Sequence, residues 1–475
     1  MTKILTPDLC VIGAGSGGLS MAAIARAFGQ TVVLIEKAKM GGDCLNYGCV
    51  PSKAMIAAGK AAHNGKTASF FGVEFTKPKI DYQKVHDHIH DVIAQIEPND
   101  SVERFEALGV HVIEAAACFE DEQTVLAGDY KIRAYRTIIC TGSSAYIPPI
   151  KGLQNTPYLT NETIFDLKEQ PDHLIVLGGG PIGLELAQAQ VRLGAKVTVV
   201  ERGKPLAKED AELSEIVIDA LTQEGVEFLD QAEVQQVRKE QKSIIVTLEK
   251  EGEEQELVAS HLLIATGRKA NLDGLSLDKA DIEYSQTGIK VDAKLRTSNR
   301  KVYAIGDVTG GFQFTHVANY HAGIAFGGIF FKSPGKVNND IIPWVTYTDP
   351  ELAHVGLTES QAKKRYGAAI RVLKWHYEEN DRARADRKIQ GVVKIVLGRK
   401  GKILGASIVG ANAGELIQMW VLAISNGLKI AAFRKMISPY PTLSEVNKRA
   451  ALTAYAEVPK KPFVRGVISF LKKLG

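Results

Sequence analysis

The stretch Gly13-Ala14-Gly15-Ser16-Gly17-Gly18 decides the fold, because an apolar strand at 8–12 precedes it and an apolar helical segment follows it. A second apolar strand at 31–35 ends in Glu36, 23 residues after Gly13. Gly13 permits a tight turn, Gly15 lets the backbone approach a pyrophosphate, and Gly18 lets the helix pack against the strand. Glu36 can bind the hydroxyl groups of a ribose. These residues predict a complete dinucleotide-binding unit.

The same pattern occurs a second time along the chain. A strand at 174–177 enters Gly178-Gly179-Gly180-Pro181-Ile182-Gly183, and a later strand at 196–200 ends in Glu201, again 23 residues after the first glycine. Gly178, Gly180, Gly183 and Glu201 therefore repeat the roles of the first set. Two such units predict two bound dinucleotides.

A cysteine pair follows the first unit, in the stretch Gly41-Gly42-Asp43-Cys44-Leu45-Asn46-Tyr47-Gly48-Cys49-Val50-Pro51-Ser52-Lys53. Four residues separate the two cysteines, and we expect a helix start on which both thiols lie on one face, about one turn apart. The thiols can then close a disulfide. A helix N-terminus and a nearby ammonium both stabilise a thiolate, so the pair is predicted to be reactive. The alternative is two ordinary buried cysteines.

These motifs, in this order, resemble the FAD-dependent pyridine nucleotide-disulfide oxidoreductases, which include dihydrolipoamide dehydrogenase, glutathione reductase and mercuric reductase. The resemblance extends to about Glu457 and implies an α/β fold with two Rossmann-like dinucleotide-binding domains plus an α+β C-terminal dimerisation domain. It assigns FAD to the first unit and the nicotinamide dinucleotide to the second. It further implies that Cys49 faces the flavin and that Cys44 attacks or binds the substrate. Lys53 and Glu185 match residues that pair near the reactive nitrogen of the flavin.

The resemblance also supplies the remaining cofactor contacts and the domain limits. A strand at 137–140 ends in Thr141 and Gly142, and a similar strand at 262–265 is followed by Gly267. The second flavin motif lies at 302–308, and the segment after it reaches Ala318. The further expected contacts are Gly42, Thr141, Gly142, Gly267, Gly306, Asp307 and Ala318. We expect an FAD-binding domain with the disulfide at 1–149, an NAD(P)-binding domain at 150–271, a second FAD-domain segment at 272–342, a dimerisation domain at 343–458 and a basic tail at 459–475.

The residue at 201 bears on the choice of coenzyme. An acidic side chain there would bind the 2'-hydroxyl of an adenosine ribose and repel a 2'-phosphate. Glu201 therefore favours NADH over NADPH. Arg202 directly after it would soften that preference.

One departure from the family bears on the electron acceptor. Where relatives lend the partner subunit of a homodimer a catalytic histidine and glutamate, this chain has Tyr440 and Glu445. An unperturbed tyrosine is only about one part in a thousand ionised at pH 7, and loss of a general base costs ~10²–10⁴ in rate. Efficient lipoamide, glutathione or trypanothione chemistry is therefore not expected. Mercuric reductases also have a tyrosine there, but they use a carboxyl-terminal cysteine pair, and this chain has no cysteine after Cys140.

We therefore expect an oxidoreductase that passes electrons from NADH through FAD to the Cys44–Cys49 disulfide and on to an unidentified, small-molecule or small-protein acceptor. The catalytic candidates are Cys44, Cys49, Lys53, Glu185, Tyr440 and Glu445. One alternative is dihydrolipoamide dehydrogenase. Another is a redox-sensing binding protein with little turnover.

Composition limits the other functional classes. The 475 residues are too many for one ordinary domain, and a net charge of +4 gives no support for nucleic-acid binding. The first apolar strand begins within ten residues of the start, which leaves no room for a signal peptide, and no apolar run is long enough to span a membrane. We expect a cytoplasmic protein, where a disulfide is more often catalytic than structural.

Two other segments carry predictions. We expect one long helix at 79–108, on which His86 and His90 could share a metal ion. No motif supplies a third ligand and a solvated helix face explains both histidines, so we expect no metal site. The segment 460–473 has five basic and no acidic residues with apolar residues at helical spacing, which makes it a candidate for peripheral membrane contact. A short helix docked on the protein is the alternative.

Overall fold

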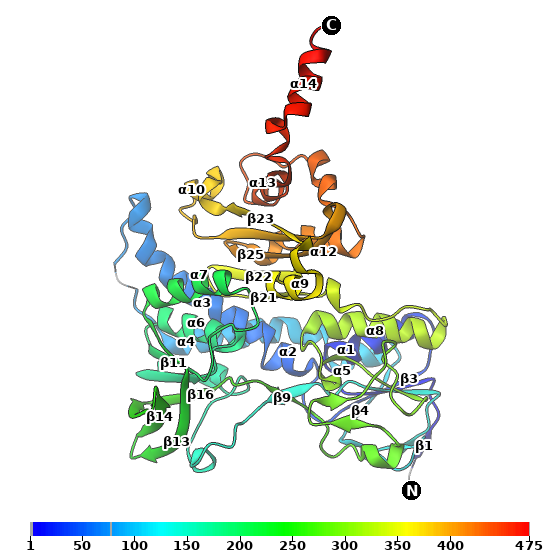
Figure 1. Cartoon of the computed structure of the whole chain (residues 1–475). Helices are drawn as coiled ribbons and strands as arrows, with labels where there is room; N and C mark the ends of the chain where they lie inside the picture. The colour runs from blue at the N-terminus through cyan, green and yellow to red at the C-terminus, as the bar shows by residue number, and fades with distance from the viewer. Residues whose placement is uncertain (1–2, 77, 475) are drawn as a thin grey trace. The chain divides into compact units, whose positions relative to one another are not determined.

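The computed structural model describes residues 3–76 and 78–474, which form two compact units. The first unit contains the chain up to Gly203 together with Gly225–Val337. The second contains Lys204–Glu224 together with the chain from Asn338 onward. In Figure 1 the second unit is coloured yellow to red, except for its helix α7 (Ala211–Glu224), which is green.

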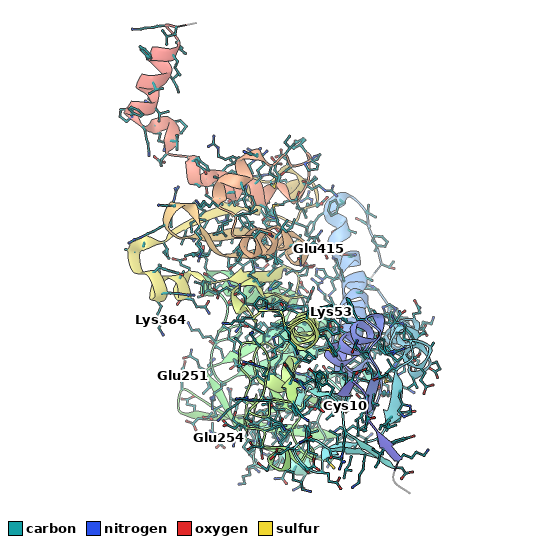
Figure 2. All side chains as sticks on the ribbon, turned by 90° about the vertical axis from the view of Figure 1, so that its right-hand side faces the viewer. Cys10, Lys53, Glu251, Glu254, Lys364 and Glu415 are labelled. Carbon is teal, nitrogen blue, oxygen red and sulfur yellow. The ribbon has the colours of Figure 1, made fainter. Side chains whose placement is uncertain are left out.

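A five-stranded parallel sheet forms the centre of the first dinucleotide region. Its strands, in order across the sheet, are β20 (Val302–Ala304), β8 (Arg136–Ile139), β2 (Leu9–Ile12), β3 (Val32–Glu36) and β4 (His111–Glu114). A strand buried on both faces needs apolar residues at every position, and all four residues of β2 are buried. Leu9 and Val11 pack with helices α1 (Ser16–Ala27) and α8 (Thr315–Phe330), whereas Cys10, labelled in Figure 2, and Ile12 pack on the opposite face.

A second, smaller sheet covers that opposite face. Its strands are β1 (Lys3–Leu5), β7 (Tyr130–Ile132), β6 (Val125–Ala127) and β5 (Ala117–Phe119). Phe119 and Ile132 of this sheet are buried together with Ile12. Because β2, β3 and β8 are parallel, their carboxyl ends meet at one edge, and this places Gly13, Glu36 and the residues after Ile139 side by side.

The second dinucleotide region repeats this plan within the same unit. Its parallel sheet has the order β12 (Val226–Asp230), β11 (Lys196–Glu201), β10 (His173–Leu177) and β16 (His261–Ile264). Helix α6 (Pro181–Arg192) follows β10. One face is covered by an antiparallel sheet of β13 (Ala232–Glu240), β14 (Ser243–Lys250) and β15 (Glu253–Ala259), whose Val246 is buried in one cluster with Ile175 and Leu262. The expected α/β class with two Rossmann-like regions is confirmed.

Short elements connect the two regions. Strand β9 (Ser143–Ala145), which follows the first dinucleotide region, pairs antiparallel with β17 (Arg268–Ala270), which follows the second region. The two short strands β18 (Tyr284–Ser285) and β19 (Gly288–Ile289) come next.

Helices α2 (Gly42–Asn46) and α3 (Cys49–Thr67) carry the cysteines. Helix α3 lies along α6, because Gly59 lets the backbone of Ala189 approach closely. This contact aligns the cysteine segment with the second region.

The single helix expected at 79–108 is wrong. The chain forms α4 (Tyr82–Ile96), a 3₁₀ turn η2 (Glu97–Asn99) and α5 (Val102–Ala107). Pro98 has no backbone N–H to continue a helix. Ser101 starts α5 by accepting a hydrogen bond from the backbone N–H of Arg104 at 3.3 Å.

The second unit is built on an antiparallel sheet. Its strands are β21 (Pro343–Thr346), β22 (Glu351–Gly356), β25 (Ile403–Gly410), β24 (Val392–Leu397) and β23 (Arg371–His376). Its remaining helices are α9 (Glu359–Tyr366), α10 (Asp381–Ala385), α11 (Ala413–Leu416), α12 (Gln418–Ser425), α13 (Glu445–Leu452) and α14 (Pro462–Leu471). Trp420 is fully buried among these elements, with Phe433 stacked on its ring. Sheet and helices together match the expected α+β character of this part.

The tail forms a helix of its own. None of the residues of α14 is buried, and the side chains of Phe463 and Phe470 are 80% and 62% exposed. In the part of the chain that the structure describes, no helix is both long enough and apolar enough to cross a membrane.

Candidate active site

The first glycine-rich turn fits a dinucleotide. Gly13 has φ +106°, and a Cβ there would lie 2.5 Å from the carbonyl oxygen of Cys140. A Cβ at Gly18 would overlap the carbonyl oxygen of Gly13. Only glycine therefore lets α1 start this close to the end of β2. Gly15 is the residue before α1, where the helix presents its first backbone N–H groups to an anion such as a pyrophosphate.

The second turn is built in the same way. Gly178 has φ +113° and approaches the carbonyl oxygen of Ala265, and Gly183 approaches the carbonyl oxygen of Gly178. Gly180 precedes α6, and a Cβ placed on it would meet none of the described atoms within 4 Å. The space in front of α6 can therefore take a phosphate group.

A carboxylate is fixed beside each turn. The Oε2 atom of Glu36 accepts a hydrogen bond from the backbone N–H of Ala14 at 2.7 Å. The Oε2 atom of Glu201 accepts one from the backbone N–H of Gly179, also at 2.7 Å. Each carboxylate is thus held beside its glycine-rich turn, as expected for an acid that binds ribose hydroxyl groups. Arg202 is directed elsewhere, since its exposed guanidinium lies 4.0 Å from Glu233.

The cysteines lie on two helices, and the expectation of one helix face is wrong. Cys44 is in α2, whereas Cys49 is the first residue of α3. Gly48 between them has non-helical backbone angles. Residues five apart on a continuous helix point about 140° away from each other, so the chain must break to bring the sulfur atoms together. Both residues are unbridged thiols in this structure.

The two thiols differ in acidity. A hydrogen bond from Cys44 is the largest of the effects that lower the pKa of Cys49 from 9.0 to about 6. The hydroxyl of Thr315, 3.4 Å from the Cys49 sulfur, and the charge of Lys53 act in the same direction, and burial opposes them. The shared hydrogen bond, burial and the Cys49 charge raise the pKa of Cys44. The N-terminus of α3 stabilises the Cys49 thiolate further. At neutral pH, Cys44 therefore carries the proton and Cys49 the negative charge.

An ion pair stands one helical turn beyond Cys49. The Nζ atom of Lys53, labelled in Figure 2, lies 2.7 Å from Oε2 of Glu185 on α6. Glu185 is buried, and Lys53 is partly exposed. Because α3 and α6 pack along each other, the ammonium is held in place rather than left on a mobile side chain. The structure thus brings Lys53 and Glu185 together, as expected.

A polar network that the sequence analysis did not predict joins the two dinucleotide regions. Arg268 of β17 donates from Nε to Ser143 Oγ at 2.7 Å and lies 3.1 Å from the carboxylate of Asp43, next to Cys44. Ser143 in turn donates to Asp307 Oδ2 at 2.6 Å. Burial raises the pKa of Asp307. The network fixes the aspartate of the second flavin motif, and its only sequence signal is the position of Arg268 directly after Gly267.

Most of the other expected cofactor contacts follow the carboxyl end of a strand. Gly42 has φ +60°, and a Cβ on it would lie 2.7 Å from the Cα of Gly15, so the start of α2 rests on the first turn. Gly306 lies against Ala318 at the start of α8. The remaining glycines, Gly142 and Gly267, have φ +69° and +144°. Thr141 is held by a hydrogen bond from its hydroxyl to the carbonyl oxygen of Asn271 at 2.7 Å.

Tyr440 and Glu445 belong to the second unit and do not pair with each other. The Tyr440 hydroxyl donates to Asp381 Oδ2 at 3.0 Å, and this hydrogen bond raises the pKa of the exposed tyrosine. Glu445 forms an ion pair with Arg449 at 2.8 Å. The carboxylate beside Tyr440 is therefore Asp381, which no motif indicated.

Two dinucleotide-binding turns, a cysteine pair with one acidic thiol and an ion pair between Lys53 and the buried Glu185 define a two-electron redox protein. A family model described as pyridine nucleotide-disulphide oxidoreductase matches residues 7–322, and the model of that family's dimerisation domain matches residues 342–451. The chain belongs to the pyridine nucleotide-disulphide oxidoreductase family, as the resemblance implied. Its cofactors are FAD and a nicotinamide dinucleotide, and both glycine-rich turns fit such groups.

The chain is similar to proteins of known name within this family. The chain is 36% identical to a mercuric reductase of Bacillus cereus over 95% of this chain and 72% of the relative, and 34% identical to one of Streptomyces lividans over 95% and 97%. It is 35% identical to dihydrolipoyl dehydrogenase of Bacillus subtilis over 94% and 96%. The HOCl-induced flavoprotein disulfide reductase RclA of Escherichia coli, solved as a Cu(II) complex, superposes with a TM-score of 0.82 at 27% identity, over 92% of this chain and 98% of that one.

Proposed function

We propose that this protein passes electrons from NADH through FAD to a Cys44–Cys49 disulfide and from there to an acceptor, in a manner similar to mercuric reductases. The observation that carries the proposal is the position of Cys49 at the start of α3, with the Lys53–Glu185 ion pair one turn further along that helix. A thiolate at Cys49 and a protonated Cys44 form the state that a reduced pair with two separate roles requires.

The cysteine pair needs no reactant other than the nicotinamide coenzyme and the acceptor. Bound FAD supplies two-electron transfer between the nicotinamide and the cysteine pair. Two electrons and one proton break the S–S bond, the proton stays on Cys44, and Cys49 keeps the negative charge. When Cys44 attacks or binds an oxidised acceptor, it releases that proton, two electrons leave with the acceptor, and the S–S bond forms again.

Lys53 and Glu185 position charge for this cycle. The ammonium of Lys53 stabilises the Cys49 thiolate, and Glu185 fixes the ammonium through the 2.7 Å contact. A lysine without that partner would lose its fixed geometry because its side chain has many rotamers. We therefore assign Lys53 to the site itself and Glu185 to its positioning.

The coenzyme is proposed to be NADH. Glu201 stands at the end of β11 with its carboxylate held at the second turn, where it can bind a ribose 2'-hydroxyl. A 2'-phosphate would meet this negative charge. Arg202 lies toward Glu233 and does little to offset it.

The acceptor is proposed to be a metal ion, a quinone or another small oxidant rather than lipoamide. Tyr440 supplies no base near neutral pH, since its hydrogen bond to Asp381 raises its pKa. Dihydrolipoamide dehydrogenase is the second candidate, favoured by the 35% identity to the Bacillus subtilis relative. A redox sensor with little turnover is the third.

One experiment separates these candidates. Steady-state oxidation of NADH is measured with Hg²⁺, Cu²⁺, a quinone, lipoamide and glutathione disulfide as acceptors, and Cys118→Ser serves as a cysteine control outside the site. The proposal is supported if a metal ion or a quinone gives sustained turnover, and if the turnover rate falls in Cys44→Ser but not in Cys118→Ser. Fast lipoamide turnover supports the second candidate, and one stoichiometric reduction without turnover supports the third.

Domain boundaries and a two-copy assembly are also proposed for this chain. Residues 272–342 are proposed to complete the FAD-binding domain begun by 1–149, since β20 pairs with β8 in one sheet. Residues 150–271 would bind the nicotinamide dinucleotide. Residues 343–458 are proposed to hold two copies of the chain together, in accordance with the match to a dimerisation domain.

The tail is proposed to contact a membrane surface rich in anionic lipids. Helix α14 exposes large apolar side chains, and five basic residues with no acidic residue lie within 460–473. This combination suits insertion at the headgroup level with charge attraction. Sedimentation with phosphatidylserine vesicles should carry down the parent protein but not Phe463→Asp. Equal sedimentation with neutral phosphatidylcholine vesicles, or none with either lipid, would contradict the proposal.

A further inference from the structure

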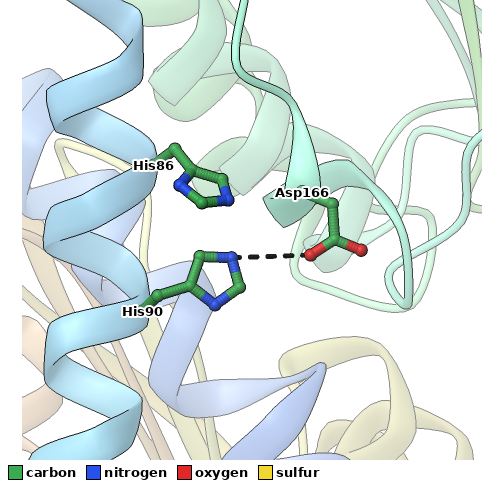
Figure 3. A group of neighbouring side chains, drawn as sticks. All are labelled: His86, His90 and Asp166. Carbon is green, nitrogen blue, oxygen red and sulfur yellow. Dashed lines mark ion pairs between the residues drawn. The ribbon is translucent and has the colours of Figure 1, made fainter.

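Two histidines and an aspartate meet away from the cysteines. His86 and His90 lie one turn apart on α4, and Asp166 ends the 3₁₀ turn η4 (Ile164–Asp166), far along the chain. One ring nitrogen of each histidine and a carboxylate oxygen of Asp166 all lie within 4.8 Å of one another. Figure 3 shows both imidazoles directed from the helix toward the carboxylate. Asp166 supplies the third ligand that no sequence motif indicated.

The hydrogen bonds leave the right atoms available. The Nδ1 atom of His86 lies 3.0 Å from Oδ1 of Asp87, so Nδ1–H donates to that carboxylate and Nε2 keeps its lone pair. A histidine that binds a metal commonly donates its other ring N–H to a carboxylate in this way. Gln83 donates to the same Asp87 oxygen at 2.8 Å and holds it in place.

The surroundings of His90 are a second observation that points to a metal ion. Its Nε2 atom is buried and makes no hydrogen bond within the described part of the chain, and Oδ1 of Asp166 lies at ion-pair distance from it, 3.5 Å (Figure 3). A buried ring nitrogen without a hydrogen bond carries an energetic cost, which a metal ion would remove. The two rings are 4.2 Å apart between centroids, so one ion can reach both.

We propose that His86, His90 and Asp166 bind one divalent transition-metal ion, with Zn²⁺ as the ion that suits two imidazoles and a carboxylate. Tetrahedral Zn²⁺ with bonds of about 2.0–2.1 Å needs ligand atoms about 3.4 Å apart, so the three side chains must draw together by roughly 1 Å. Water completes the coordination. The ion would tie α4, which packs on the cysteine-bearing α3, to the segment that leads into the second dinucleotide region.

The test must keep thiols from binding the metal. We start from FAD-loaded Cys44→Ser/Cys49→Ser protein and titrate Zn²⁺ against a chromophoric chelator at pH 7.5. We expect one tightly bound Zn²⁺ per chain. His90→Gln and Asp166→Asn should each weaken binding at least tenfold, and Asp87→Asn about tenfold, as expected for a residue that orients a ligand.

His88→Gln is the matched control, because this exposed histidine lies on the same helix between the two proposed ligands in sequence. It should leave Zn²⁺ affinity unchanged. Zn²⁺ should also raise the melting temperature of the starting protein and not that of His90→Gln, while flavin absorbance reports that each variant is folded. Absence of stoichiometric binding, or equal affinity in His90→Gln and the starting protein, would overturn the proposal.

Discussion

The acidity of Cys49 can be tested by removing the hydrogen bond from Cys44. That bond is the largest effect that lowers the pKa from 9.0 to about 6, and Thr315 and Lys53 provide the rest. Cys44→Ala removes the donor, whereas Cys44→Ser keeps a hydroxyl in its place. A hydrogen bond to a charged group contributes about 1.5–3 kcal/mol, so we expect the Cys49 pKa to rise by roughly 1–2 in the alanine variant and by less in the serine variant. Each unit corresponds to about 1.4 kcal/mol less stabilisation of the thiolate.

The assay is the rate of alkylation by iodoacetamide as a function of pH, on reduced protein. A rate at one pH is a poor measure, because a thiolate of higher pKa is also a better nucleophile and the two effects nearly cancel. The midpoint of the pH profile reports the pKa directly. A parent midpoint near 9, or identical midpoints for parent, Cys44→Ala and Cys44→Ser, would refute the assignment of the thiolate to this hydrogen bond.

Three further predictions concern other parts of the chain. NADH should have a higher kcat/KM than NADPH, and Glu201→Ala should reduce that preference mainly through KM; preference for NADPH in the parent would contradict this. Tyr440→His should raise dihydrolipoamide oxidation at pH 8 at least tenfold, with Asp381 as the orienting carboxylate, and leave quinone reduction unchanged; an inactive variant would show that the geometry does not accept a base. Burial raises the pKa of Glu209 from 4.5 to about 7. Between these two pH values the Glu209 carboxyl is protonated in the folded state and ionised in the unfolded state. The free energy of unfolding therefore falls as the pH rises from 4.5 to about 7. Glu209→Gln, which keeps an acceptor for Trp344, should therefore melt about 2–6 °C higher than the parent at pH 8 and not at pH 4.5.

Local patterns predicted the parts of the fold that local physics controls. Gly13 and Gly178 have positive φ, and Gly18 and Gly183 each approach the carbonyl oxygen of the glycine five residues earlier, so the sequence alone indicates both turns. The prediction of one long helix at 79–108 was wrong although the sequence contains signals of a break. Pro98 cannot continue a helix, and Ser101 is a residue that caps the start of a new one. The apolar period continued across the break and concealed it.

Contacts between distant segments could not be predicted. Arg268 reaches Ser143 across 125 residues, and Tyr440 meets Asp381 across 59. No spacing rule links such pairs, because packing of the intervening elements decides their distance. The thiol acidities are of the same kind, since Thr315 reaches Cys49 only through the placement of α8.

Arg268 connects the second dinucleotide region with the cysteine pair of the first. Its strand β17 follows strand β16 of the second dinucleotide region, and its guanidinium lies 3.1 Å from Asp43, the neighbour of Cys44. A coenzyme that displaced β17 would change the charge beside the dithiol. By thermodynamic reciprocity, the oxidation state of the dithiol then changes coenzyme affinity by the same factor, tenfold for each ~1.4 kcal/mol of coupling. Coenzyme release and thiol oxidation would then form one linked equilibrium.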